Sequence, residues 1–270
     1  MGIWKKTILG LYIFCIQKYS RYRIKYLKFL PNTPLAHPKS RLLFKIMTKY
    51  VSTQFEPTIR EELDFYMKHH YELEDLQEGL GMATWLEFIK KTENLEGDIL
   101  ELGIYRGGST VMGARFLKKL GSKRKIYACD AFSGLPYDDK FSYSTNAKGW
   151  YSETSADLAL DKFKKFGVDE HIVLVEGLFE DTLYKQLSDK KFSLVLVDCD
   201  LYDATKFSLK FVYPRLVDGG IIMFDDYDRV NRDEPMWGET KAVNEFCSSK
   251  NINVNTFPEP HIIKQKIVDW

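Results

Sequence analysis

Hydrophobic residues in this chain gather, from about residue 97 onward, in short unbroken runs that finish on or beside an acidic residue. Apolar runs of this length that are rich in β-branched residues are typical of strands covered on both faces. The pattern predicts five strands, within residues 97–102, 125–130, 171–177, 192–198 and 219–228.

Helical stretches lie between these runs, at residues 109–120, 154–166, 179–187 and 204–216. Strands that alternate with helices are typical of parallel sheets with right-handed crossovers, in which ligands bind at the carboxyl ends of the strands. We therefore predict an α/β fold with a doubly wound, mostly parallel sheet of the Rossmann-like kind. Residues 58–91 also have a helical pattern, so a helical extension precedes the sheet.

The junction between the first strand and the next helix reads ELGIYRGGST, residues 101–110. Its glycines Gly103, Gly107 and Gly108 allow the backbone to approach a ligand closely, but their spacing differs from the dinucleotide fingerprint GxGxxG. Glu101 places a negative charge where a phosphate would otherwise bind, so it suits a cationic group such as an amine. The alternative is a tight turn in which Glu101 only caps backbone amides.

Asp130 ends the second run, 27 residues beyond Gly103, which is the interval of one helix and one strand. In doubly wound folds an acid at this position accepts hydrogen bonds from ribose hydroxyls. An amine near Glu101 and a ribose near Asp130 together favour S-adenosylmethionine over NAD. The alternative for Asp130 is an ordinary turn before Gly134.

The predicted donor site draws on the ends of four strands and on the turns that follow them. Glu176, with Gly177 beside it, is the candidate on the adenine side. The residues predicted to bind the donor are Glu101, Gly103, Tyr105, Gly107, Ser109, Thr110, Asp130, Ser133, Glu176, Gly177 and Asp198.

Acidic residues crowd the ends of the fourth and fifth strands, which we expect to be neighbours in the sheet. Asp198 and Asp200 follow the fourth strand, and Asp225 and Asp226 follow the fifth. Oxygen ligands without a nearby His or Cys favour a hard ion such as Mg²⁺. The predicted metal ligands are Asp198, Asp225 and Asp226, and the predicted catalytic base is Asp198 or Asp200.

Other residues after the same strand ends have two interpretations each. Asp200, Asp203 and Asp228, each taken singly, are better explained as solvated loop acids. The alternative for Asp225 and Asp226 is that they only cap turns. Tyr202, Tyr227 and Trp237 are candidates for stacking on a sugar, and the alternative is that they belong to the core or to a lid.

Five blocks of the sequence, taken together, resemble the macrocin O-methyltransferase family, Mg²⁺-dependent enzymes that methylate sugar hydroxyls. The blocks are ELGIYRGGST, CDAFSGLP, VEGLFEDTL, VDCDLYDATKFSLKFVYPRLVDGGIIMFDDY and KAVNEF, and they lie between residues 97 and 246. The resemblance implies a class I methyltransferase core, S-adenosylmethionine as the methyl donor and a metal at Asp198, Asp225 and Asp226.

Composition agrees with an enzyme that has one sizeable core. The 270 residues are 44% hydrophobic, and the formal net charge of +1 provides no general attraction to nucleic acid. The four cysteines have no CxxC spacing, which argues against a zinc site or a disulfide framework and favours a reducing, cytoplasmic location.

The first fifty residues differ from the rest of the chain. The run ILGLYIFCI, residues 8–16, is far shorter than the roughly 20 residues that span a bilayer. The next residues, KYSRYRIKYLKF, interleave basic with aromatic and aliphatic side chains, so this arm could lie peripherally on an anionic membrane or contact a second subunit of a homo-oligomer. The alternative is a helix that packs on its own domain.

These patterns predict three segments and one main function. Residues 1–50 form the arm and a Pro-containing linker, residues 51–96 a helical lid, and residues 97–270 the catalytic domain. Together with the resemblance, these patterns imply an S-adenosylmethionine- and metal-dependent O-methyltransferase that acts on a hydroxyl of a sugar or glycosylated small molecule. The alternatives are an NAD-dependent oxidoreductase, which the missing GxGxxG disfavours, and a non-catalytic methyltransferase-like partner, which the three acids disfavour.

Overall fold

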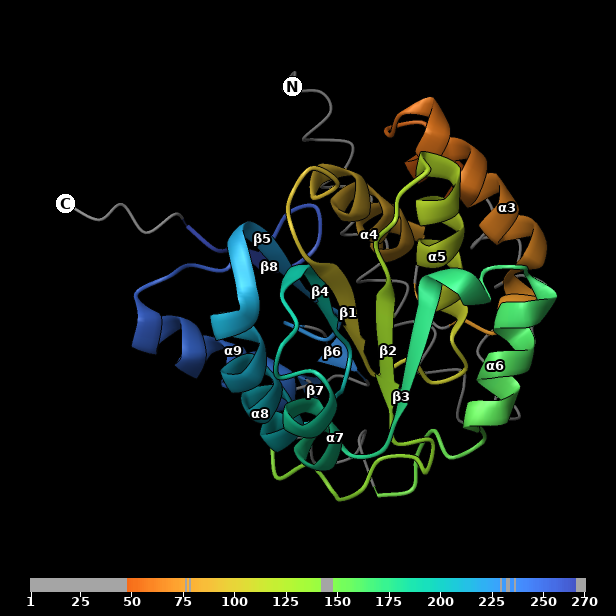
Figure 1. The fold of residues 1–270 in the computed structure, drawn as a ribbon. Helices are drawn as coiled ribbons and strands as arrows, with labels where there is room; N and C mark the ends of the chain where they lie inside the picture. Colours follow the sequence, from red (N-terminus) through yellow and green to blue (C-terminus); the bar gives the residue numbers. More distant parts are fainter. Residues whose placement is uncertain are drawn as a thin grey trace.

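The structure is a computed structural model that describes residues 48–75, 77, 79–141, 148–228, 230–231, 234–235 and 237–265. Most of the predicted N-terminal arm and its linker therefore lies outside the described residues. Within the described chain, the predicted alternation of strands and helices is present from residue 97 onward (Figure 1).

A six-stranded sheet runs through the middle of the molecule, in the order β3-β2-β1-β4-β5-β8 (Figure 1). The first five strands pair in parallel and β8 pairs antiparallel with β5, which confirms the predicted mostly parallel α/β sheet. The strands are β1 (Asp98–Leu102), β2 (Ile126–Asp130), β3 (Ile172–Glu176), β4 (Phe192–Val197), β5 (Leu216–Phe224) and β8 (His261–Ile263). The order reverses direction between β1 and β4, where doubly wound folds bind their ligands.

Helices cover both faces of the sheet (Figure 1). One face carries α3 (Pro57–Leu73), α4 (Gly79–Lys91), α5 (Gly108–Leu120) and α6 (Ala156–Lys165). The other face carries α7 (Phe179–Gln186), α8 (Tyr202–Val212) and α9 (Trp237–Lys250). Short elements complete the chain: the 3₁₀ turns η1 (Asp169–His171) and η2 (Tyr213–Arg215), and a small ribbon of β6 (Val230–Asn231) and β7 (Glu234–Pro235).

Successive side chains of each central strand enter opposite cores because side chains alternate across a strand. In β1, Ile99 joins the core under α4 and α5, whereas Leu100 and Leu102 join the core under α8. Glu101 therefore points to the same face as Ile99, toward α5. This alternation places a carboxylate in an otherwise apolar layer.

The prediction of a helix at residues 204–216 was wrong at the carboxyl end of the helix. Helix α8 stops at Val212, and Tyr213–Arg215 form the 3₁₀ turn η2. Pro214 explains the difference, since proline has no backbone N–H and cannot donate the next hydrogen bond of the α-helix. Strand β5 then begins at Leu216, three residues before the predicted start at Gly219.

Strand β8 was not predicted. It has three residues and pairs with residues 221–223, near the carboxyl end of β5, where Met223 lies opposite His261. Its short length leaves too few positions for a recognisable hydrophobic pattern.

The predicted lid region forms two helices that pack beside the first junction. Helices α3 and α4 contact α5, and α4 also contacts β4. That these helices act as a lid over the methyl donor stays a prediction. Among the described helices, none combines the length and hydropathy that crossing a bilayer requires.

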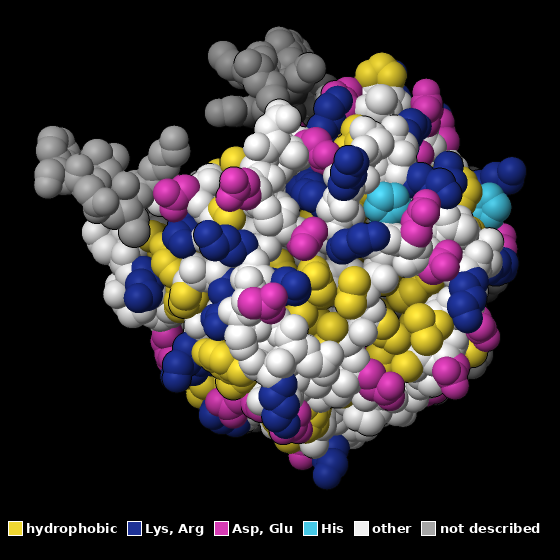
Figure 2. Space-filling view, in the orientation of Figure 1, with side chains coloured by type: hydrophobic (Ala, Val, Ile, Leu, Met, Phe, Trp, Pro, Cys, Tyr) yellow, Lys and Arg dark blue, Asp and Glu magenta, His cyan; other side chains and the backbone are white. Residues whose placement is uncertain are grey.

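Basic and acidic side chains are interspersed over the face that Figure 2 shows, with hydrophobic patches between them. This mixture accords with the formal net charge of +1. The expectation that the protein does not bind nucleic acid stays a prediction.

The buried Arg124 guanidinium ties three elements together at the amino edge of the sheet. It donates to the Ile89 carbonyl (2.7 Å) and the Ser193 hydroxyl (3.1 Å), and it forms an ion pair with Glu93. Removing one partner of a buried ionic network leaves the others unpaired, which typically costs about 3–5 kcal/mol.

We predict that Arg124→Met lowers the free energy of unfolding by about 3 kcal/mol. The control is Lys123→Met, an exposed neighbour, which should change stability by less than about 0.5 kcal/mol. Denaturant titration of both variants measures this. Equal stabilities would show that the Arg124 network contributes nothing beyond a surface contact.

Candidate functional site

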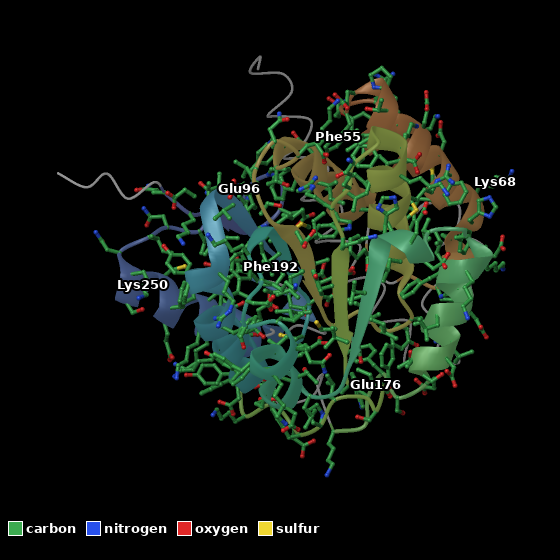
Figure 3. All side chains as sticks on the ribbon, in the orientation of Figure 1. Phe55, Lys68, Glu96, Glu176, Phe192 and Lys250 are labelled. Atoms are coloured by element: carbon green, nitrogen blue, oxygen red, sulfur yellow. The ribbon has the colours of Figure 1, made fainter. Side chains whose placement is uncertain are left out.

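The carboxyl ends of the parallel strands form one edge of the sheet. In Figure 3, Glu176 at the end of β3 marks this edge, and Glu96, close to the start of β1, lies at the opposite edge. The acids predicted as site residues all lie at the Glu176 edge or just inside it.

Glu101 is fully buried beneath the first turn of α5. The Ser109 hydroxyl donates a hydrogen bond to one carboxylate oxygen, Oε1. The other oxygen, Oε2, has no hydrogen-bond partner among the described residues. Glu101 is thus held by α5 on one side, and one oxygen is left for a further donor.

Burial raises the pKa of Glu101 to about 7. The hydroxyls of Ser109 and Thr110 lower this pKa, and the charges of Asp75 and Asp130 raise it. A cationic group beside Oε2 would stabilise the ionised form.

The glycines of the junction are required by contacts within the chain. At Gly103 φ is +89°, and a Cβ would lie 1.7 Å from the carbonyl oxygen of Asp198. At Gly107 φ is +75°, and a Cβ would lie 2.7 Å from the ring of Phe163. The first junction is therefore in direct contact with the end of β4, and the close approach of a ligand to these glycines stays a prediction.

Asp130 connects the turns after β1 and β2. Its carboxylate accepts hydrogen bonds from the backbone amides of Ile104 (2.9 Å), Tyr105 (2.8 Å) and Phe132 (2.7 Å). Burial raises the pKa of Asp130, and these amides lower it. A carboxylate has about four acceptor positions, so little capacity is left for ribose hydroxyls.

The other predicted donor-site residues surround Asp130. Glu176 is exposed and lies opposite Asp130 in the register of β2 and β3. The Gly177 amide donates to the Asp130 carbonyl (2.9 Å), and Ser133 is exposed in the next turn. Tyr105 has a positive φ of 49°, and its carbonyl accepts a hydrogen bond from Thr154 (2.6 Å).

The predicted acids converge at the ends of β4 and β5. Carboxylate oxygens of Asp198, Asp200 and Asp226 lie within 4.8 Å of one another. We call these three residues, together with Asp225, the acid cluster. The tightest group includes Asp200, whereas the predicted ligand set has Asp225 in its place.

Electrostatic repulsion within the acid cluster is strong. Burial raises the pKa of Asp198 well above its usual range, and the charges of Asp225, Asp226 and Asp200 add to this effect. A hard divalent cation binds carboxylate oxygens that lie close together and offsets their repulsion. The residues present therefore fit Mg²⁺.

The structure separates the solvated acids from those of the acid cluster. Asp203 has a side chain that is 52% exposed and pairs with Lys140, and Asp228 is exposed. Asp200 is only partly exposed, has a positive φ of 61° and belongs to the tight group. The interpretation of Asp200 as a solvated loop acid was therefore wrong.

Two of the aromatic candidates pack against α9. The Tyr202 hydroxyl donates to Glu245 (2.6 Å), and the Tyr227 hydroxyl donates to Asn244 (2.9 Å). Both tyrosines therefore contact α9, and stacking of their rings on a sugar stays a prediction. The Trp237 side chain lies outside the described part of the chain.

Three residues beside the acid cluster were missed by sequence reasoning. Fully buried Glu239, in the first turn of α9, accepts a hydrogen bond from the Asp226 amide (2.9 Å). The charge of Asp200 raises the pKa of Tyr151, whose ring lies 5.8 Å from that of Tyr105. Asp139 accepts a hydrogen bond from the backbone amide of Tyr202 (2.8 Å), the first residue of α8.

Little in the sequence could have identified these residues. Tyr151 and Asp139 lie in the long connection between β2 and α6, where no periodic pattern exists. Glu239 follows a glycine and opens a helix, which suggests a helix start and not a site.

The sequence of the chain matches a model of the macrocin-O-methyltransferase (TylF) family over residues 81–257. Over 143 residues it is 29% identical to the 8-demethyl-8-(2,3-dimethoxy-alpha-L-rhamnosyl)-tetracenomycin-C 4'-O-methyltransferase of Streptomyces olivaceus, covering 50% of this chain and 54% of the relative. Over 145 residues it is 29% identical to the mycinamicin III 3''-O-methyltransferase of Micromonospora griseorubida, covering 50% and 57%. The chain thus spans about half the length of the curated relatives it matches.

Solved structures share the fold. The O-methyltransferase NovP superposes with a TM-score of 0.61 at 22% identity, covering 70% of this chain and 81% of NovP. The calicheamicin methyltransferase CalS11 also has a TM-score of 0.61, at 19% identity, covering 87% of this chain and 95% of CalS11. The described sheet is therefore a methyltransferase fold.

We predict that Gly103→Ala destabilises the protein by about 3–5 kcal/mol, since a Cβ would both clash with the Asp198 carbonyl and disfavour the positive φ. The control is Gly121→Ala, because Gly121 has a φ of +69° but open space around it, so only the backbone cost of about 1–2 kcal/mol is expected. Chemical denaturation compares the two. Similar losses would show that the clash is relieved by movement of β4.

The raised pKa of Glu101 predicts a pH-dependent stability. Between pH 4.5 and about 7 the native protein keeps the Glu101 proton and the unfolded chain loses it, so the free energy of unfolding falls as the pH rises through this range. Glu101→Gln has no proton to lose. The stability of the wild type relative to Glu101→Gln should therefore fall by about 3 kcal/mol between pH 4.5 and pH 8.

Denaturation at several pH values, with exposed Glu96→Gln as the control, measures this difference. A constant difference between the wild type and Glu101→Gln across the range would show that Glu101 is ionised in the ligand-free protein.

Proposed function

The chain belongs to the macrocin-O-methyltransferase family. We propose that it transfers a methyl group from S-adenosylmethionine to a hydroxyl of a sugar or glycosylated small molecule. A divalent cation at the acid cluster is part of this proposal. The observation that carries this proposal is the direct contact between the first junction and the acid cluster, through Gly103 and the Asp198 carbonyl. Donor and acceptor must meet for a direct transfer, and this contact brings their predicted sites together.

The relatives support the substrate class. Two of them are named as O-methyltransferases of a rhamnosyl tetracenomycin and of mycinamicin III. The methyltransferase PaMTH1 of Podospora anserina, a structure with a TM-score of 0.54, is described as bound to S-adenosylhomocysteine. These likenesses favour the same donor and a glycosylated acceptor for this chain.

Donor binding would use the two strand-end acids. Glu101 has an oxygen without a partner among the described residues, which suits the amine of the methionine moiety. Asp130 already accepts hydrogen bonds from three backbone amides, so its carboxylate has about one acceptor position left for a ribose hydroxyl. Glu176 and Gly177 would then border the adenine side.

Asp198, Asp225 and Asp226 would hold the cation, with Asp200 close to them. A bound divalent cation would lower the pKa of the acceptor hydroxyl. The acceptor oxygen forms a bond to the methyl carbon as the bond from the sulfonium sulfur to that carbon breaks. The hydroxyl proton passes to Asp198 or Asp200, and the products are a methyl ether and S-adenosylhomocysteine.

The other predictions depend on regions that the structure does not describe or on partners that it does not contain. A cytoplasmic location, contact of the N-terminal arm with a membrane surface and a homo-oligomer stay proposals. The oxidoreductase alternative has no support in the family match. A non-catalytic partner is disfavoured because the acids of the proposed site converge.

We predict that Asp198→Asn and Asp226→Asn each reduce methyl transfer by on the order of 100-fold or more, because the acid cluster acts on the acceptor hydroxyl. Asp226→Asn should still bind S-adenosylhomocysteine, since Asp226 is not among the residues predicted to bind the donor. Asp203→Asn, an exposed neighbouring acid, is the matched control and should keep full activity. Transfer of labelled methyl to candidate glycosides and nucleotide sugars, with and without EDTA and Mg²⁺, measures the activity. Full turnover in EDTA would refute the role of the cation.

A further inference from the structure

Glu239 is a buried carboxylate beside the acid cluster that the proposed mechanism does not use. It lies in the first turn of α9 and has no exposed surface. Gly238, directly before it, is packed against two segments. A Cβ there would lie 2.0 Å from an oxygen of Asp139, in the connection between β2 and α6, and 3.0 Å from the carbonyl oxygen of Asp200, in the turn after β4. The start of α9 is therefore packed on the residues that carry the acids.

The first turn of α9 holds the turn after β5 at two points. Glu239 Oε1 accepts a hydrogen bond from the Asp226 amide (2.9 Å), and the Thr240 hydroxyl accepts one from the Asp228 amide (2.7 Å). These bonds fix the backbone from which the Asp226 carboxylate projects. Asp226 therefore owes its position to a helix that follows it in the chain, as well as to β5.

The two oxygens of Glu239 lie in different surroundings. Oε2 is buried and has no hydrogen-bond partner among the described residues. The charged groups that act on Glu239 are Asp226, Asp225 and Asp200, which all repel it. The hydrogen bond from the Asp226 amide to Oε1 is therefore the contact through which Glu239 acts on the acid cluster.

We propose that Glu239 is a positioning residue for the cation site, which holds Asp226 through its backbone amide so that the Asp226 carboxylate faces Asp198 and Asp200. This inference rests on the proposed function, because it requires a cation at the acid cluster. Residues that orient metal ligands through hydrogen bonds typically change metal affinity by about 10–100-fold when they are removed.

Three substitutions separate the position of the oxygen from its charge. Glu239→Gln keeps an oxygen at the place of Oε1 and removes the charge. Glu239→Asp keeps the charge but withdraws the oxygen by one methylene. Glu239→Ala removes both, and Lys250→Gln, at the exposed end of the same helix, is the control.

The experiment is binding of Mn²⁺ to the full chain, followed by the electron paramagnetic resonance of the free ion. We expect Glu239→Gln and the control to bind Mn²⁺ within about 3-fold of the wild type, and Glu239→Asp and Glu239→Ala to bind at least about 10-fold more weakly. Circular dichroism and S-adenosylhomocysteine binding confirm that each variant is folded. If Glu239→Ala does not fold, Glu239→Asp provides the same comparison.

The contrary outcomes are distinct. Equal affinities in all variants, or a loss in Glu239→Gln with retention in Glu239→Asp, would overturn the positioning role. A wild-type protein that does not bind Mn²⁺ at millimolar concentration would instead overturn the cation site itself, and with it this inference.

Discussion

Crowding of carboxylates at the carboxyl edge of the sheet is the constraint on which the rest of this site depends. Parallel strands bring their ends together, so the acids that follow β4 and β5 meet within a few ångströms. Removed from water, such groups repel one another and favour their protonated forms. The raised pKa of Asp198 is the direct consequence, and a divalent cation is the simplest relief.

Hydrogen bonds with backbone groups, some from segments distant in the sequence, hold the acidic residues at this edge in place. Asp130 accepts hydrogen bonds from three backbone amides in two separate turns, and Glu239 accepts one from the backbone amide of Asp226. The Gly103 contact with the Asp198 carbonyl joins the two halves of the edge. The proposed donor and acceptor sites are therefore in direct contact with each other.

Much of the fold could be predicted from the chain because its signals are local. Apolar runs and helical periodicity within short windows revealed the five parallel strands and the helices that separate them. The end of α8 was predicted four residues too late, where Pro214 decides the boundary. Strand β8 was missed because three residues contain no readable pattern, and its place is decided by the free edge of β5.

The sequence by itself determined which acids stand at strand ends, because an acid that follows an apolar run is visible in the order of residues, as with Asp130 and Asp198. Only the tertiary structure decided which of them share a site and what holds them. Asp200 belongs to the tight group because of the turn after β4, and Glu239, 13 residues beyond Asp226 in the sequence, belongs to helix α9. Distances between segments depend on packing of the whole sheet, so no local pattern contains them.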